Sequence, residues 1–132
     1  MDNPLPFLLL EGIEQFNERR LDDCHETFDG LWMTERKNPE VRNLLKGLIQ
    51  ICVGLIQERM GNRKGAVRLL TNALELLRPL APAYLGIDVG SLVESSSRLK
   101  RFLEESPGRV GLPSHLIPCV RFTEGPLLDR AC

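Results

Sequence analysis

The side chains that could perform chemistry lie close together in one short stretch, His25-Glu26-x-x-Asp29. In a helix, residues four apart share a face, so His25 and Asp29 would stand one turn apart. This spacing matches the zinc-binding motif H-E-x-x-H, whose glutamate is a general base, except that Asp29 replaces the second histidine. A zinc ion would need further ligands from Glu11 or Glu14. One hypothesis is therefore a metal-dependent hydrolase with His25, Asp29, Glu11 and Glu14 around the metal.

Two other hypotheses for the same stretch need no metal. His25 could donate a hydrogen bond to Asp29 or to a carboxylate of the preceding helix, which would join the first two helices. Alternatively, the stretch could form a polar pocket for a small ligand or a partner's peptide, with Trp32 as its aromatic wall. In both cases we expect His25, Asp29 and Trp32 to face the first helix as one cluster.

Of these hypotheses, we favour a non-catalytic module that binds a protein partner or a small ligand around the second helix. The hydrolase is the alternative. The predicted contacts are polar or aromatic side chains of the second and third helices: His25, Glu26, Asp29, Trp32, Arg42, Lys46 and Gln50. No catalytic residue and no cofactor are predicted. Nucleic acid is not expected as a partner because aromatic residues for base stacking are scarce. The chain could also associate with itself.

Hydrophobic periodicity predicts the elements that would position these residues. Apolar residues recur at helical spacing, and prolines or glycines separate the segments. The predicted helices span residues 6–18, 21–35, 39–60, 63–78 and 88–105, and no sheet is expected. We expect a helical domain over residues 1–105, followed by an irregular tail over 106–132 that is rich in proline and glycine.

The third predicted helix has the widest apolar arc and should be the centre of the core. Leu48 lies near the middle of that arc and should be fully buried. The segment Gly61-Asn62-Arg63-Lys64-Gly65-Ala66 looks like the turn of a tetratricopeptide repeat. The predicted fold class is all-α, a five-helix array of antiparallel hairpins that is tetratricopeptide-like.

Charge is distributed unevenly along a chain whose formal net charge is only −1. Residues 1–35 carry nine acidic and two basic side chains, whereas the remainder is basic. The two parts could therefore attract each other. Arg59 falls within the apolar arc of the third helix, and we expect it to reach a carboxylate of the first hairpin such as Glu14, Asp22 or Asp29.

The cysteines indicate a location for the protein. None of the four has C-x-x-C spacing, which favours reduced thiols in a cytosolic protein. No segment has the roughly twenty apolar residues needed to span a bilayer, and a signal-peptide pattern is missing at the start. We therefore expect a cytoplasmic protein that does not bind membranes.

The order of several short motifs resembles a known family. These motifs are Gly12-Ile13 with Phe16-Asn17, His25-Glu26-x-x-Asp29-x-x-Trp32, Gln50-Ile51, Gly61-Asn62-x-x-Gly65-Ala66-x-x-Leu69-Leu70 and Gly86-Ile87-Asp88-Val89. Together they resemble domain of unknown function 309, a family of small helical proteins of bacteria and plastids. The resemblance implies a helical fold and no established activity. The family usually has Gly where Arg19 stands, an aromatic residue at Leu21 and Glu at Asp29, so a tight left-handed turn at Arg19 is in doubt.

Overall fold

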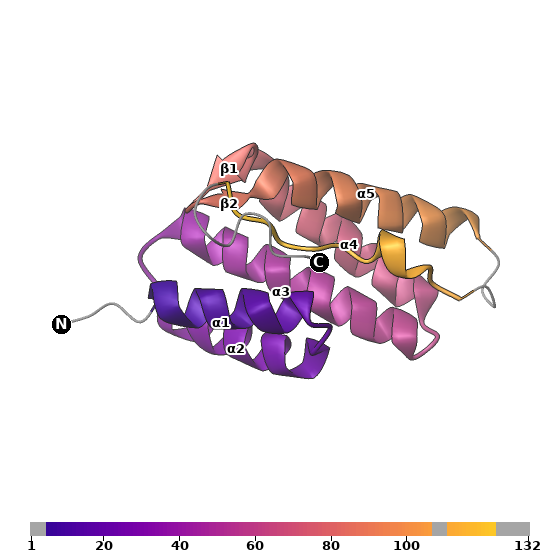
Figure 1. Ribbon diagram of the computed structural model, residues 1–132, viewed down its shortest axis with the longest axis horizontal. Helices are drawn as coiled ribbons and strands as arrows, with labels where there is room; N and C mark the ends of the chain where they lie inside the picture. Colours follow the sequence, from indigo (N-terminus) through magenta and orange to yellow (C-terminus); the bar gives the residue numbers. More distant parts are fainter. Residues whose placement is uncertain (1–4, 107–110, 124–132) are drawn as a thin grey trace.

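Five α-helices make up most of the protein. The computed structural model describes residues 5–106 and 111–123. The helices are α1 (Leu5–Asn17), α2 (Leu21–Thr34), α3 (Pro39–Arg59), α4 (Arg63–Leu77) and α5 (Val89–Glu105), with short 3-10 helices η1 (Arg78–Leu80) and η2 (Ser114–Leu116). Successive α-helices run antiparallel side by side (Figure 1). The all-α fold class is confirmed, and each predicted boundary lies within one residue of the observed one.

Polar residues before the helices explain where three of them begin. The side chain of Asn38 accepts hydrogen bonds from the N–H groups of Glu40 and Val41, and Pro39 occupies the first turn of α3. Asn62 caps α4 and Asp88 caps α5 in the same way. The first N–H groups of a helix have no partner within it, so each such cap stabilises the fold by about 1 kcal/mol.

The third helix is the centre of the core, as its apolar arc predicted. Leu44, Leu48 and Ile51 are fully buried, and α3 packs against both α2 and α4. At Gly47 a Cβ atom would lie 2.6 Å from Cγ of Leu77, so α4 approaches α3 too closely there for any side chain. This close approach holds the second hairpin, α3–α4, together, and the packing of α2 on α3 joins it to the first, α1–α2.

A small β-hairpin between α4 and α5 shows that the expectation of no sheet was wrong. Strands β1 (Ala83–Tyr84) and β2 (Ile87–Asp88) pair antiparallel, with Leu85 and Gly86 as the turn. Both turn residues have positive φ, at 51° and 76°, which suits a tight two-residue hairpin. With two residues in each strand, the hairpin is too short to produce a visible alternating pattern in the sequence.

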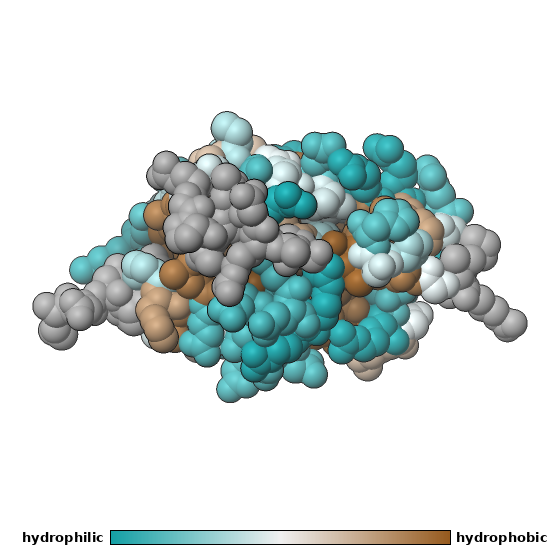
Figure 2. Space-filling model, in the orientation of Figure 1, coloured by the Kyte–Doolittle hydropathy of each residue, from teal (hydrophilic) through white to brown (hydrophobic). Residues whose placement is uncertain are grey.

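The described part of the tail packs on the helices. Residues 111–123 cross the face between α5 and the α1–α2 hairpin (Figure 1), and Val120 is only 2% exposed. Phe122 forms a bridge with Ile87, and the N–H of Asp88 donates to the carbonyl of Arg121. On the face in Figure 2, hydrophobic side chains show mainly in the band that this segment crosses. Residues 107–110 and 124–132 of the predicted tail lie outside the described residues.

The turn between α1 and α2 departs from the family pattern in sequence but keeps its backbone shape. Arg19 has a φ of 66°, so the left-handed turn exists despite the side chain. The guanidinium of Arg19 donates to the carbonyl of Pro118 at 3.2 Å, which links this turn to the tail. The doubt raised by the missing glycine is therefore removed.

Two further expectations about single residues are corrected. Arg59 is exposed, and within the described part of the chain it forms no ion pair, so the expected bridge to Glu14, Asp22 or Asp29 is wrong. As the last residue of α3, its side chain extends into water instead. The prediction of reduced thiols is confirmed for the free cysteines Cys24 and Cys52, whereas Cys119 is disulfide-bonded. No helix in the described ranges has the length and apolar character needed to cross a membrane.

Candidate functional site

Trp32 packs against α3, where two basic residues cover its ring. The guanidinium carbon of Arg42 lies 4.2 Å from the ring centroid, and Nζ of Lys46 lies 4.7 Å from it. Arg42 also donates from Nη1 to the carbonyl of Trp32, at 3.0 Å, and to that of Glu35. The last carbonyl groups of a helix have no intrahelical donor, so Arg42 caps the end of α2. The structure thus brings together three of the predicted site residues in a contact that holds α2 on α3.

The expected cluster of His25, Asp29 and Trp32 against α1 is wrong, because Trp32 faces α3. At about 100° per residue, His25 lies about 20° from Trp32 around the axis of α2 and so shares its flank. His25 is half-buried and Asp29 is exposed, and neither forms a hydrogen bond within residues 5–106 and 111–123. Gln50, on α3, is half-buried, and its Oε1 atom is buried with no hydrogen-bond partner among the residues that the structure describes. Whether these residues bind a partner stays a prediction.

The proposed metal ligands do not converge. Among the described residues, no group of three or more His, Cys, Asp or Glu side chains could hold a metal ion. The reason lies in the two flanks of α2: His25 shares the α3 flank with Trp32, whereas Glu11 accepts a hydrogen bond from Gln15 on the α1 side. The combination of His25, Asp29, Glu11 and Glu14 is therefore not a metal site in this arrangement.

A groove lies on the other flank of α2, between it and α1. Its volume is about 400 Å³. Acidic side chains line it from both helices, with Glu11 from α1 and with Asp23 and Glu26 from α2. Leu8 and Leu31 line the apolar part of its wall. Of the seven residues predicted to bind a partner, Glu26 alone lines this groove.

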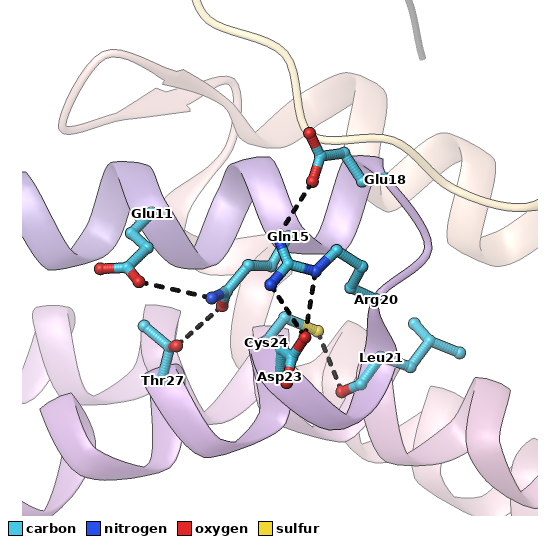
Figure 3. Close-up of polar contacts among 8 residues, drawn as sticks. All are labelled: Glu11, Gln15, Glu18, Arg20, Leu21, Asp23, Cys24 and Thr27. Carbon is cyan, nitrogen blue, oxygen red and sulfur yellow. Dashed lines mark hydrogen bonds and ion pairs between the residues drawn. The ribbon is translucent and has the colours of Figure 1, made fainter.

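Hydrogen bonds fix the polar floor of the groove. Oγ1 of Thr27 donates to Oε1 of Gln15 at 2.7 Å, and Nε2 of Gln15 donates to Glu11 at 3.5 Å (Figure 3). Gln15 is only 8% exposed, so its amide is held in one orientation between the two helices. A buried polar group with satisfied hydrogen bonds is rigid, and the floor is thereby organised before any ligand arrives.

Arg20 occupies the end of the groove near the α1–α2 turn. Its guanidinium bonds Asp23 at 3.0 Å and Glu18 at 3.3 Å (Figure 3). These two carboxylates raise the pKa of Arg20 through hydrogen bonds and charge. Glu26, about one turn after Asp23 in α2, has no hydrogen bond or ion pair in the described part of the molecule. Its charge is therefore available to a partner.

Gly30 lines the same groove, and no packing contact with the described residues requires a glycine there. A Cβ atom built at Gly30 would meet nothing within 4 Å. In contrast, a Cβ at Gly12 would lie 2.4 Å from Cε1 of Phe28, so packing of α1 on α2 requires that glycine. A glycine inside a helix destabilises it by roughly 0.5–1 kcal/mol relative to alanine. The sequence analysis did not predict the groove or a role for Gly30. A glycine in the middle of a helix, close to acidic residues, was the signal that could have indicated them.

Comparison with known proteins relates part of this chain to a family. Residues 9–69 match the family described as Domain of unknown function (DUF309). The chain is also 34% identical over 74 residues to "Uncharacterized protein YpuF" of Bacillus subtilis (strain 168). That match covers 54% of this chain and 42% of YpuF, so it spans less than half the length of the relative. The resemblance seen in the sequence is therefore confirmed: residues 9–69, which contain most of α1, all of α2 and α3 and the start of α4, match the DUF309 family.

Proposed function

We propose that this chain is a non-catalytic, cytoplasmic helical module that binds a protein partner through the surface around α2. The contact site is the groove between α1 and α2. The observation that carries this proposal is the free carboxylate of Glu26 beside Gly30, since neither residue packs against another part of the chain within residues 5–106 and 111–123.

The form of the groove supports a peptide or a helix as the ligand. It runs along two antiparallel helices, and its lining combines leucines with carboxylates. Small-molecule sites are usually concave and mostly apolar, whereas grooves between two helices accept an extended segment or a further helix. A protein partner therefore suits the lining better than a compact ligand does.

The alternative of a metal-dependent hydrolase has less support. His25 lies on the α3 flank of α2, whereas Glu11 and Glu14 belong to α1, and no three of the described metal-binding side chains come together. For the cytoplasmic location, the free thiols of Cys24 and Cys52 are in favour and the disulfide of Cys119 is against, because disulfides are rare where the compartment is reducing.

Site-specific photo-crosslinking in cells of the source organism tests the proposal. A photoreactive amino acid at Glu26 points into the groove, and the same residue at exposed Asp29 is the matched control on the same helix. We expect one discrete protein adduct from position 26 and none from position 29. Equal adducts from both positions, or none from either, would contradict it. An adduct with a second copy of this chain would identify the partner as self-association.

A further inference from the structure

We infer that the ligand of the α1–α2 groove is a basic amphipathic helix whose apolar side chains precede or follow its Lys and Arg residues. This inference rests on the proposed function and specifies the class of partner. Three independent features of the groove support this inference. They are its charge, its apolar end and the exposed backbone at Gly30.

Charge at the groove selects a cationic partner. Asp23 and Glu26 line it from α2 and Glu11 lines it from α1. The single basic residue in its lining, Arg20, is already engaged with Asp23 and Glu18. Glu26 has no partner among the described residues, and Glu11 accepts only one long hydrogen bond, at 3.5 Å. Lys or Arg side chains of a ligand would therefore meet carboxylates with unused acceptor capacity.

Apolar residues gather at the opposite end of the groove. Leu8 and Leu31 line the groove, and because α1 and α2 are antiparallel, the start of α1 lies beside the end of α2. Phe7 and Met33 do not line the groove, but they follow or precede residues of this end in the helices and are 73% and 55% exposed. Large exposed side chains of this kind are candidates for contact with a partner. The ligand must therefore present an apolar part to this end and a basic part to the other.

Gly30 lies among the α2 residues of this lining, between Glu26 and Leu31 in the sequence, and lets another helix approach. Its missing side chain leaves the backbone of α2 open at the groove, with nothing within 4 Å of a built Cβ. Small residues at such positions allow two helices to pack closely. Since glycine weakens α2, its presence here fits a contact that the free chain does not contain.

Binding of two designed peptides tests the inference. The first is a helical peptide whose groove-facing positions are Leu in one half and Lys in the other, and the second has every Lys replaced by Glu. Fluorescence anisotropy of the labelled peptides with the full chain gives their affinities. We expect the Leu/Lys peptide to bind at least about tenfold more tightly than the Leu/Glu peptide, a difference of about 1.4 kcal/mol.

Three variants locate the contact. Glu26→Lys should weaken binding of the Leu/Lys peptide about tenfold, whereas Asp29→Lys makes the same change of net charge outside the groove and should leave it nearly unchanged. Gly30→Gln should raise the melting temperature, because glutamine is the better helix former, and should still weaken binding about tenfold. This opposite movement of stability and affinity is not expected of a glycine with a structural role only.

Each contrary result has a defined meaning. Equal affinity for the two peptides, equal losses from Glu26→Lys and Asp29→Lys, or unchanged affinity in Gly30→Gln would overturn the inference. If crosslinking at position 26 still identifies a partner, the proposed function stands and only the class of ligand was wrong. If neither crosslinking position yields an adduct, the proposed function itself fails.

Discussion

Asn17 and Val120 exchange two hydrogen bonds across 103 positions of the chain. Nδ2 of Asn17 donates to the carbonyl of Val120, and the N–H of Val120 donates to Oδ1 of Asn17, each at 2.9 Å. The amide thus pairs with the tail as a neighbouring strand would. This contact joins the end of α1, within the family match, to a segment that follows the match.

Replacing Asn17 should release the tail from the helices. Asn17→Ala removes both hydrogen bonds and leaves the N–H and the carbonyl of Val120, which is only 2% exposed, without these partners. We therefore expect a loss of about 1–3 kcal/mol in the free energy of unfolding. Hydrogen exchange of residues 111–123 should accelerate. Asn43→Ala, at an exposed position of α3, is the control and should change neither measurement. Unaltered exchange in Asn17→Ala would show that other contacts hold the tail.

The helices could be predicted from the sequence because their signals are local. Periodic apolar residues mark the helix faces, and Pro39, Gly61 and the capping residues Asn38 and Asn62 mark the ends. The tail contact could not be predicted, since a hydrogen bond between residues 17 and 120 leaves no periodic trace. The β-hairpin was missed because Leu85, which takes a positive φ, is not a typical turn residue.

The candidate site was predicted only in part, for a geometric reason. A helical wheel gives the angular order of His25, Asp29 and Trp32 around α2 but does not show which neighbouring helix lies on which flank. Trp32 was assigned to the wrong neighbour, α1 instead of α3. The groove lies on the flank that carries Glu26 and Gly30.

Two helical glycines should respond to alanine in opposite directions. Gly30→Ala adds a methyl group in open space and improves helix propensity, so it should stabilise the protein by about 0.5–1 kcal/mol. Gly12→Ala would place a Cβ 2.4 Å from Cε1 of buried Phe28 and should destabilise it by about 1–3 kcal/mol. Urea denaturation of both variants measures the difference. A destabilised Gly30→Ala would show that the glycine has a structural role in the free chain.

The guanidinium of Arg42 should be required to stabilise the C-terminal end of α2. Arg42→Lys keeps the charge but loses the planar group that stacks on Trp32 and donates to two carbonyl groups. We expect a loss of about 1–3 kcal/mol and a shifted emission spectrum of Trp32, the one tryptophan of the chain. Arg36→Lys, at an exposed position, should alter neither the spectrum nor the melt. Identical behaviour of the two variants would mean that charge alone suffices at position 42.

The buried thiol of Cys52 should make stability depend on alkaline pH. Cys52 is fully buried, and its Sγ atom lies 2.7 Å from Sγ of Cys24. Burial is the largest cause that raises the pKa of Cys52 well above that of an ordinary thiol, and the contact with Cys24 adds to it. The thiol of the unfolded chain ionises near pH 8.5, whereas the folded chain keeps Cys52 protonated. Stability from the neutral thiol is therefore complete below this pH and falls as the pH rises above it.

A comparison with Cys52→Ala isolates this contribution. Urea denaturation of both proteins between about pH 7 and pH 10 gives their free energies of unfolding as functions of pH. The two curves should approach each other as the pH rises, because only the wild-type chain loses the stability that comes from a neutral Cys52. The slope of the difference should not exceed about 1.4 kcal/mol per pH unit for one group. Titrating groups that do not touch Cys52 are common to both proteins and cancel in the difference, and the additional variant Cys24→Ala shows the part that comes from its partner thiol. Parallel curves would show that Cys52 ionises equally in the folded and unfolded states, contrary to its burial.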